Sequence, residues 1–341
     1  MLKRHKLFQH NMDDKYKKRQ SKSNLFLSVL RWIDSEAGMD APEDTEEGGK
    51  RVDWLRVAPL ILLHAGCLLV VWVGWSPVAV IVALVLYLIR MFAITGFYHR
   101  YFSHKAFKTN RFWQFVFAVI GNASVQRGPL WWASHHRHHH RFADRDNDVH
   151  SPLRHGFWWS HIGWLTDPAN FATRWEYVKD WAKFPELVWL DRFDKVVPIL
   201  LGLTLFGVGE ILARTSPHLG TNGAQLVIWG FFISTVILFH GTCTINSLSH
   251  LFGWRRYVTR DTSRNNPILA IITLGEGWHN NHHHYPISTR QGFFWWEYDI
   301  TYYLLVVMSW LGIIGNLRPV PENVRRPETT TGSLIGTRGG G

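Results

Sequence analysis

The sequence has few cysteines: Cys67 and Cys243 are the only two in 341 residues, and both lie in apolar runs. This scarcity excludes a disulfide-stapled scaffold and any cysteine-rich zinc or iron–sulfur site. The formal net charge is +11, but the basic residues are scattered along the chain and the sequence contains no recognisable nucleic-acid-binding module. The charge therefore does not indicate a nucleic-acid-binding protein. No secretory signal precedes the charged first 50 residues. A haem or flavin domain is likewise missing, so we expect electrons, if used, to come from a separate partner.

Long apolar runs are abundant, although the mean hydropathy of −0.09 resembles that of a soluble protein. A bilayer core about 30 Å thick requires about 20 apolar residues in each spanning helix. The predicted spans are residues 57–76, 77–97, 196–213 and 225–245. Two shorter runs, residues 112–121 and 302–315, suit interfacial or re-entrant helices better than spans.

The positive charge predicts the orientation. Of 37 lysines and arginines, 35 fall in residues 1–56, 99–195 and 246–341. The positive-inside rule places these three regions on the cytoplasmic side. The predicted fold is therefore an all-α integral membrane protein with four transmembrane helices in two hairpins and both termini cytoplasmic. Arg90, in the second span, is expected to snorkel or to meet a polar partner.

The polar ends of the chain suggest a simple domain organisation. Residues 1–50 and 318–341 are charged or rich in Pro, Thr and Gly, and we predict solvated or disordered tails there. Between them, residues 51–317 form the predicted membrane domain with its cytosolic helical cap.

Histidine is the unusual residue, with 20 copies, most of them clustered on the predicted cytoplasmic side. Two clusters repeat the spacing i, i+3, i+4, which points side chains toward one helix face. His99 and His104 are five residues apart, about 140° on a regular helix, so His104 is expected where a helix ends or bends. The clusters read HRYFSH from His99, HHRHHH from His135, NSLSH from Asn246 and HNNHHH from His279.

The number of grouped histidines suggests the kind of site. Imidazole binds iron, copper, nickel and zinc well, and nine grouped histidines suit two ions better than one. A closed structural zinc site needs only four ligands, and an ion pathway would place ionisable groups inside the spans. A histidine-bound pair of ions beside lipid therefore suits redox-active iron and O₂ chemistry. The alternative is a histidine-rich surface tract that binds metal loosely.

The remaining histidines receive other interpretations. His64 and His240, within the spans, are expected to hydrogen-bond to neighbours or carbonyls. Three that lie off the helical spacing are predicted not to be ligands: His135, His138 and His284. Three more stay open between support of the ligands, substrate contact and packing: His150, His155 and His161.

The histidine motifs, in this order and topology, closely resemble those of the membrane fatty acyl-CoA desaturases of the stearoyl-CoA (Δ9) type, over about residues 57–320. Two longer segments make the resemblance to this family more specific: GEGWHNNHHHYP and NDVHSPLRHGFWWSHIGW. The sequences of the histidine motifs are more similar to those of bacterial members than to those of animal members. It implies a mushroom-like fold with a bent apolar tunnel and a di-iron centre. The ligands it implies are His99, His104, His136, His139, His140, His250, His279, His282 and His283, with Asn246 reaching one metal through water.

The resemblance also implies contacts along the tunnel. Gln126 and Thr242 match polar residues at the tunnel's kink. Cys243 departs from the family pattern, because animal members have tryptophan at this position. Residues here shape the tunnel, and the tunnel shape sets the acyl-chain length and the position of the double bond, so the resemblance does not define these two properties.

Basic residues are candidates for binding the acyl carrier. Arg137 matches the arginine inside the second histidine motif, and Arg154 with His155 aligns with a basic pair of the family. Arg127 stands where the family has a polar residue. The alternative for each arginine is pairing with a carboxylate or with the membrane surface.

The implied activity is an O₂-dependent desaturation that places a cis double bond in a saturated acyl chain, with acyl-CoA as the expected carrier and Δ9 as the expected position. Alkyl C–H bonds offer no acid–base handle, so a cofactor must supply the difficult chemistry. A ferredoxin-type protein or a membrane electron carrier is the expected donor, and a bacterial inner membrane the expected location.

Two rival functions remain open at the level of sequence. A membrane di-iron hydroxylase would use the same ligand spacing and place oxygen on the carbon instead. A non-enzymatic membrane metal transporter or sensor would use the histidines as a loose cytosolic metal-binding loop.

Overall fold

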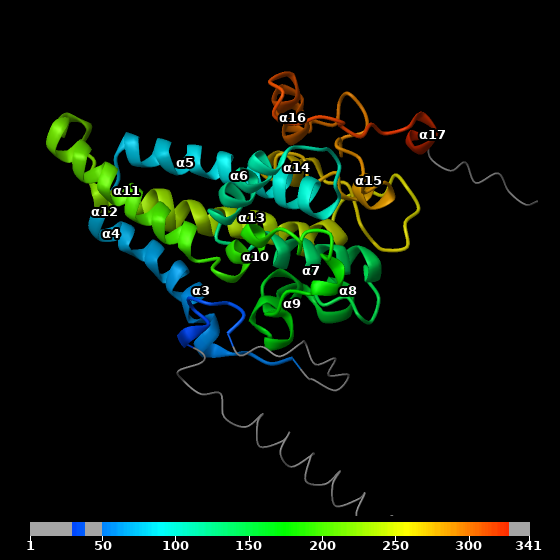
Figure 1. Cartoon of the computed structure of the whole chain (residues 1–341), viewed down its shortest axis with the longest axis horizontal. Helices are drawn as coiled ribbons and strands as arrows, with labels where there is room; N and C mark the ends of the chain where they lie inside the picture. The colour runs from blue at the N-terminus through cyan, green and yellow to red at the C-terminus, as the bar shows by residue number, and fades with distance from the viewer. Residues whose placement is uncertain (1–28, 38–49, 327–341) are drawn as a thin grey trace, which may run out of the picture.

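The computed structural model describes residues 29–37 and 50–326, and this part of the chain is helical with no β-strand. Four helical stretches are long and apolar enough to cross a membrane, which confirms the predicted spans. In Figure 1 they extend to the left of a cap of shorter helices. Their bounds are Trp54–Val73, Pro77–Ser103, Val196–Thr215 and Gly223–His250.

The first hairpin consists of α3 (Trp54–Gly66), η1 (Cys67–Leu69), α4 (Val70–Val73), α5 (Pro77–Phe92) and η2 (Ala93–Ser103). Asp53 caps α3 by accepting a hydrogen bond from the backbone N–H of Arg56 at 3.0 Å. Ser76 caps α5 in the same way, and Pro77 occupies the first helical position, where its missing N–H costs nothing.

The second hairpin consists of α11 (Val196–Thr215), η6 (Pro217–Leu219), α12 (Gly223–Leu226), η7 (Val227–Ile233), α13 (Ser234–Ser247) and η8 (Leu248–His250). Gly209 permits close packing here, because a Cβ on it would lie 2.5 Å from the carbonyl oxygen of Asn222. The two hairpins meet at their far ends, where Gln225 donates to the carbonyl of Val73 and Trp229 to that of Gly74, both at 2.9 Å.

The cap is built from short helices that precede α11 or follow η8. The first set is α6 (Arg111–Asn122), α7 (Pro129–Phe142), α8 (Pro152–His155), α9 (Phe157–His161), η3 (Gly163–Thr166), η4 (Pro168–Asn170), η5 (Trp175–Tyr177) and α10 (Pro185–Arg192). The second set is α14 (Pro267–Ile272), α15 (His279–His284), α16 (Ile300–Trp310) and α17 (Glu322–Arg325). Helices α6 and α16 cover the two shorter apolar runs, and neither is long enough to count as a span, as predicted.

The inner end of the second span is wound as a π-helix, η2, in which hydrogen bonds join residues i and i+5. His99 and His104 have that separation, and the N–H of His104 donates to the carbonyl of His99 at 3.2 Å. The rings consequently lie one above the other, with centroids 4.9 Å apart. His104 is the residue at which this helix ends, as the sequence predicts.

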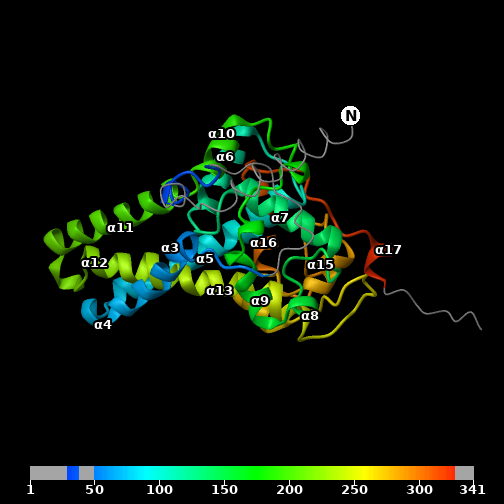
Figure 2. The same ribbon diagram turned by 90° about the horizontal axis from the view of Figure 1, so that it is seen from below.

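The core of the cap surrounds η2. Phe97, Tyr98 and Phe102 are nearly inaccessible and pack against α6 and α7, with the rings of Phe97 and Phe117 stacked at 4.0 Å. Figure 2 shows α7, α15 and α16 gathered at this end, away from the tips of the hairpins. The last turns of the second span are therefore a rigid part of the cap.

Arg90 meets polar partners, as expected, and all of its partners are neutral. Its guanidinium donates to Thr235 Oγ1 at 2.6 Å, to Ser234 Oγ at 2.7 Å and to the carbonyl of Gly230 at 3.2 Å. Gly230 lies in the π-helix η7, whose irregular winding makes such carbonyls available. Arg90 thus joins the two hairpins without a carboxylate.

The structure corrects the expected boundaries of the tails. Residues 29–37, assigned to a solvated tail, pack on α10: Ser35 is 1% exposed and its hydroxyl donates to the carbonyl of Asp191 at 3.1 Å. At the other end, Val320 is 5% exposed, beyond the expected boundary at residue 317. Short polar segments can be ordered when a buried backbone accepts their hydrogen bonds. Residues 1–28, 38–49 and 327–341 of the two predicted tails lie outside the described residues.

Candidate metal centre

Nine histidines from distant parts of the chain form two groups at the cap end of the spans. Within each group the nearest ring nitrogens all lie within 4.8 Å of one another. The nine are the same histidines that the sequence grouped. The first group is His99, His104, His136, His140 and His282, and the second is His139, His250, His279 and His283.

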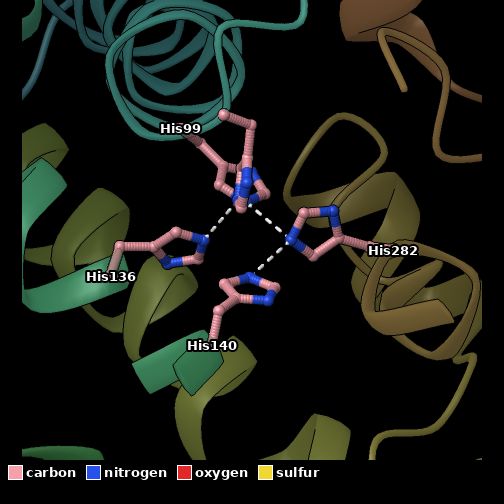
Figure 3. Close-up of side chains that lie close together, drawn as sticks. His99, His136, His140 and His282 are labelled. Atoms are coloured by element: carbon pink, nitrogen blue, oxygen red, sulfur yellow. Dashed lines mark hydrogen bonds between the residues drawn. The ribbon is translucent and has the colours of Figure 1, made fainter. Parts of the chain in front are cut away.

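The first group converges through its Nε2 atoms. The distance between His99 Nε2 and His282 Nε2 is 3.0 Å, between His104 Nε2 and His136 Nε2 2.8 Å, and between His282 Nε2 and His140 Nε2 2.9 Å. Figure 3 shows four of these rings turned toward one shared point, with His99 on η2, His136 and His140 both on α7, and His282 on α15. Such convergence is the arrangement that a bound cation requires.

The second group lies next to the first. His250 Nε2 and His279 Nε2 are 3.1 Å apart, and the ring of His283 is 5.4 Å from that of His250. The rings of His140 and His283, one from each group, stack at 4.5 Å. The two groups therefore lie side by side and could hold two ions next to each other.

The helical spacing divides each motif between the groups. On α7, His136 and His140 belong to the first group, whereas His139 belongs to the second. On α15 the division is the reverse: His282 belongs to the first group and its neighbours His279 and His283 to the second. Residues i and i+4 lie above one another while i+3 is offset around the helix. A helix placed between two sites therefore supplies ligands to both.

Carboxylates lie behind several of these rings. His139 Nδ1 is 3.1 Å from Asp148, and His283 Nδ1 is 2.8 Å from Asp261. His250 Nδ1 is likewise 3.1 Å from Asp144, and His99 Nδ1 contacts Glu276. A carboxylate at Nδ1 holds the proton there and leaves Nε2 as the free donor atom.

Sequence reasoning missed these carboxylates. A usable signal existed, because Asp144 and Asp148 follow the second motif within eight residues and Glu276 stands three residues before His279. Asp261 carried no such signal, because the loop that brings it to His283 is set only by tertiary packing. Gln291 was missed as well, and its side chain amide lies 3.3 Å from His99 Nδ1.

Burial keeps most of these rings neutral. Burial, reinforced by neighbouring histidines, lowers the pKa of His136, His140 and His282 well below its usual range. His139 differs: burial lowers its pKa, but the charge of Asp148 outweighs burial and the net pKa is raised. Neutral imidazole is the form that binds metal. The site is therefore prepared for cations near neutral pH.

The donor set fits two ions of the iron type. Where two Nε2 atoms face each other at about 3 Å, only one proton fits between them, and a shared cation relieves the crowding. Within the described residues His283 Nε2 is buried and has no hydrogen-bond partner. Sets of five and four imidazole nitrogens, several with a carboxylate behind the ring, suit iron better than a closed four-ligand zinc site.

Asn246 lies beside the groups, at the wall of a small cavity that His136, His139 and His279 also line. A third set of close ligand atoms, His139, Asp148 and His150, overlaps the second group. The histidines predicted not to be ligands lie outside all three sets. His135 Nε2 contacts the carbonyl of Ala172 at 3.1 Å, His284 stacks on Tyr257 at 4.0 Å and His138 packs beside Phe142.

Two cavities adjoin the histidine groups. The larger, of about 490 Å³, runs between α3, α11 and α13, and the smaller, of about 40 Å³, lies against η2, α7 and α13. The side chain amide of Gln126 donates to Thr242 Oγ1 at 2.9 Å, and both line the larger cavity together with Cys243. The residues that line both cavities are Trp132, His136, Thr242 and Asn246.

The basic residues predicted to bind substrate divide into two kinds. Arg127 lines the larger cavity and pairs with Asp194 at 2.7 Å. Arg137 lines neither cavity, because its guanidinium is held by Asp180 and by backbone carbonyls that include those of Phe102 and Tyr177.

Arg154 and His155 also lie away from both cavities. Arg154 is exposed and pairs with Asp146 at 3.2 Å, and His155 Nε2 contacts the carbonyl of Asp148 at 2.9 Å. The structure therefore brings only Arg127, of the four predicted carrier contacts, to a cavity wall.

Comparison with known proteins gives a consistent result. The family model described as fatty acid desaturase matches residues 54–308. The chain is 36% identical to an sn-2 palmitoyl-lipid 9-desaturase of Nostoc sp., over 81% of this chain and 93% of that protein. It is 34% identical to delta-9 acyl-lipid desaturase 1 of Arabidopsis thaliana, over 82% and 88%. It is also 34% identical to an acyl-CoA 5-desaturase of Anemone leveillei, over 81% and 85%.

Proposed function

Because this chain belongs to the fatty acid desaturase family and is an oxidoreductase that acts on acyl chains, we propose that it introduces a cis double bond at the Δ9 position, using O₂, two irons and an external electron donor. The observation that carries the proposal is the position of the two histidine groups. They lie where a largely apolar cavity of about 490 Å³ adjoins a smaller cavity of about 40 Å³.

The nine grouped histidines would hold the irons, five at one ion and four at the other. Asn246 would reach one of the two irons through water. Two bound irons supply the O₂ chemistry that breaking an unactivated C–H bond requires. The carboxylates of Asp148, Asp261, Asp144 and Glu276 hold the proton of their histidine at Nδ1.

The protein's own contribution is to position two adjacent carbons and to exclude water. The hydrogen bond between Gln126 and Thr242 satisfies two polar groups at the cavity wall and holds the two side chains against each other there. Trp132 and Thr242 line both cavities, so they border the point where the chain passes from one to the other. Holding the reacting atoms in one geometry is a large part of the rate gain in such reactions.

The remaining parts of the proposal concern partners and location. Electrons come from a ferredoxin-type protein or a membrane carrier that docks on the cap. The membrane protein lies in a bacterial inner membrane with both termini cytoplasmic. The sequence favours acyl-CoA as carrier, while the names of the relatives include acyl-lipid and acyl-CoA enzymes.

The proposal is tested by fatty-acid profiling of a desaturase-deficient host that produces this chain. We expect new cis-Δ9 monoenes, identified by gas chromatography with mass spectrometry of derivatives that locate the double bond. A matched strain producing the His282→Ala variant, inserted at the same level, is expected to lack them. Hydroxylated chains would support the hydroxylase alternative, and an unchanged profile with an active donor present would reject the proposal.

A further inference from the structure

Two residues with an unusual backbone conformation flank Gln126. The φ angle is 60° at Val125 and 68° at Arg127. L-residues disfavour this left-handed region, because it brings Cβ close to the following carbonyl oxygen. Valine is particularly rare there, and within the described residues Val125 is the only β-branched residue with a positive φ. Such strain persists only where the surrounding structure holds it, and it is typical of ligand clamps.

Asn122 bonds to both strained residues. Its carbonyl accepts a hydrogen bond from the N–H of Val125 at 3.1 Å, and its side chain amide donates to the carbonyl of Arg127 at 3.1 Å. Asn122 is the last residue of α6 and is inaccessible to solvent. One buried residue therefore spans the loop and holds the backbone on both sides of Gln126.

Other elements fix the two ends of the loop. The hydroxyl of Ser124 donates to the carbonyl of Arg90 at 3.1 Å, which ties the loop to the second span. On the other side, the guanidinium of Arg127 pairs with Asp194 at 2.7 Å and donates to the carbonyl of Phe171 at 3.0 Å. These contacts come from separate parts of the fold. They hold the loop in a conformation that its own residues disfavour.

Gln126 is directed by this loop to the place where the two cavities adjoin. It is 9% exposed and lines the larger cavity. Its amide nitrogen donates to Thr242 Oγ1 at 2.9 Å, and its amide oxygen accepts from the indole N–H of Trp132 at 3.4 Å. Trp132 and Thr242 both line the two cavities. Both ends of the Gln126 amide are therefore held by residues of the junction.

Trp132 connects this amide to the histidine groups. It lies one turn before His136 on α7, and the two rings stack with their centroids 5.1 Å apart. The ring of Trp132 also lies 5.9 Å from that of His99. Both histidines belong to the first group. The place of the Gln126 amide relative to this group is consequently set through a single side chain.

We propose that residues 122–127 act as a strained clamp that decides which pair of acyl carbons lies beside the histidine groups. Asn122 is the positioning residue, and it acts through Gln126, whose amide meets the acyl chain in the larger cavity. This inference rests on the proposed function and deepens it. The carbons of a saturated chain are chemically alike, so only their place distinguishes them, and a misplacement of about 1 Å is enough to change reactivity strongly. The strained loop gives this amide a fixed place at a cost in stability.

The test uses the full-length protein produced in a desaturase-deficient host, with double-bond positions determined by gas chromatography and mass spectrometry. Asn122→Ala removes the hydrogen bond to the carbonyl of Arg127 and lets the strained backbone relax. The share of double bonds at neighbouring positions should rise about tenfold, the change expected when one hydrogen bond no longer selects between positions. Ser124→Ala, a milder release of the same loop, should change this share in the same direction even if Asn122→Ala folds poorly.

The strain itself is tested by adding Val125→Gly to Asn122→Ala. Glycine adopts a positive φ without strain, so the loop no longer tends to relax when the hydrogen bond is lost. The double variant should return most of the product to the wild-type position and should melt at a higher temperature than Asn122→Ala. Hydrogen exchange of the metal-free proteins depends on neither iron nor product. Residues 123–128 should exchange faster in Asn122→Ala than in the wild type, and Val125→Gly should reverse this change.

Gln225→Ala is the matched control. Like Asn122, Gln225 is buried, donates from its side chain amide to a backbone carbonyl and has an amide oxygen with no hydrogen-bond partner within the described residues. It lies at the far ends of the hairpins, so Gln225→Ala should lower stability and leave the double-bond position unchanged.

Three results would overturn this inference and leave the proposed desaturation intact. The first is a wild-type distribution of positions in both Asn122→Ala and Ser124→Ala. The second is a distribution as broad in Gln225→Ala as in Asn122→Ala, and the third is a double variant with Val125→Gly that stays as broad as Asn122→Ala alone. Absence of monoenes from the host that produces the wild-type protein would instead reject the proposed function.

Discussion

The protein contains two separate sets of histidines whose rings contact one another within the set. The two sets differ in how their ring nitrogens are arranged. At the cap, nine rings direct Nε2 inward, and several have a carboxylate at Nδ1. Between the spans, His64, His240 and His161 form a line. His64 Nε2 is 3.1 Å from His240 Nε2, and His240 Nδ1 is 3.0 Å from His161 Nε2.

The line ends on neutral groups. His64 Nδ1 is 2.8 Å from the carbonyl of Leu60, and His161 Nδ1 is 2.9 Å from Ser247 Oγ. The ring nitrogens of these three histidines meet only in pairs along the line, and within the described residues they do not gather at one point where a metal ion could bind. The comparison teaches that histidine contact alone does not define a metal site. Convergent donor atoms with proton-holding carboxylates behind them do.

The largest expected effect comes from removing one convergent ring. His139→Ala is expected to lower bound iron and to reduce desaturation at least about a hundredfold, because the second group loses one of its four nitrogens. Iron per protein is measured by plasma mass spectrometry and product by gas chromatography. His138→Ala, its neighbour outside both groups, is the control and is expected to keep most of its iron. An active His139→Ala protein would refute the ligand assignment.

A smaller effect is expected from the carboxylates behind the rings. Asp261→Asn keeps the size of the side chain but weakens its hold on the proton at His283 Nδ1. Iron affinity should fall about 10- to 100-fold, measured by competition with a chelator, and excess iron should restore activity. Asp146→Asn is the control, since Asp146 is 88% exposed and contacts Arg154 instead. Equal affinities of the two variants would contradict the role of the carboxylate.

The metal-free protein should also lose stability in mild acid. The pKa values of His104, His136, His140, His279 and His282 lie well below the usual 6.5 in the folded protein, because the rings are buried. Below pH 6.5 the unfolded chain therefore takes up protons that the folded chain does not, and unfolding becomes easier as the pH falls. Each such histidine contributes about 1.4 kcal/mol per pH unit, and His139, whose pKa is raised, acts in the opposite direction.

Thermal unfolding of the metal-free protein in detergent, measured from pH 7.5 to 5.5, checks this expectation. The melting temperature should fall with pH below 6.5. A constant melting temperature over that range would show that the rings are not held neutral.

The smallest expected effect comes from the line of histidines between the spans. His240→Leu removes two hydrogen bonds, to His64 and His161, and should cost about 1–3 kcal/mol of stability at the contact of α3 with α13. Iron content and product should stay near the wild-type level, measured as for His139→Ala. Loss of iron in His240→Leu would remove the distinction between the two sets.

Much of the fold was predictable because its signals are local. A span needs about 20 apolar residues, and the four runs and the distribution of basic residues show the spans and their pairing directly. The grouping of the histidines followed from helical spacing, with one exception. His99 and His104 are too far apart around a regular helix, and only the π-winding of η2 brings them together.

Other parts of the site could not be predicted in this way. Asp261 reaches His283 from a loop 22 residues earlier, and no periodic pattern marks that approach. Arg137 was a reasonable carrier contact by its position inside a histidine motif, but its partners, Asp180 and the carbonyls of η2, come from elsewhere in the fold.

The order of residues along the chain, by itself, determined how many helices cross the membrane, on which side the histidines gather and that about nine of them act together. These properties depend on spacing and polarity within short stretches, which the backbone geometry of a helix converts directly into faces and lengths. Packing decided the division into groups of five and four and the carboxylates behind the rings. These features join residues far apart in the chain, and only the packed fold determines which of them meet.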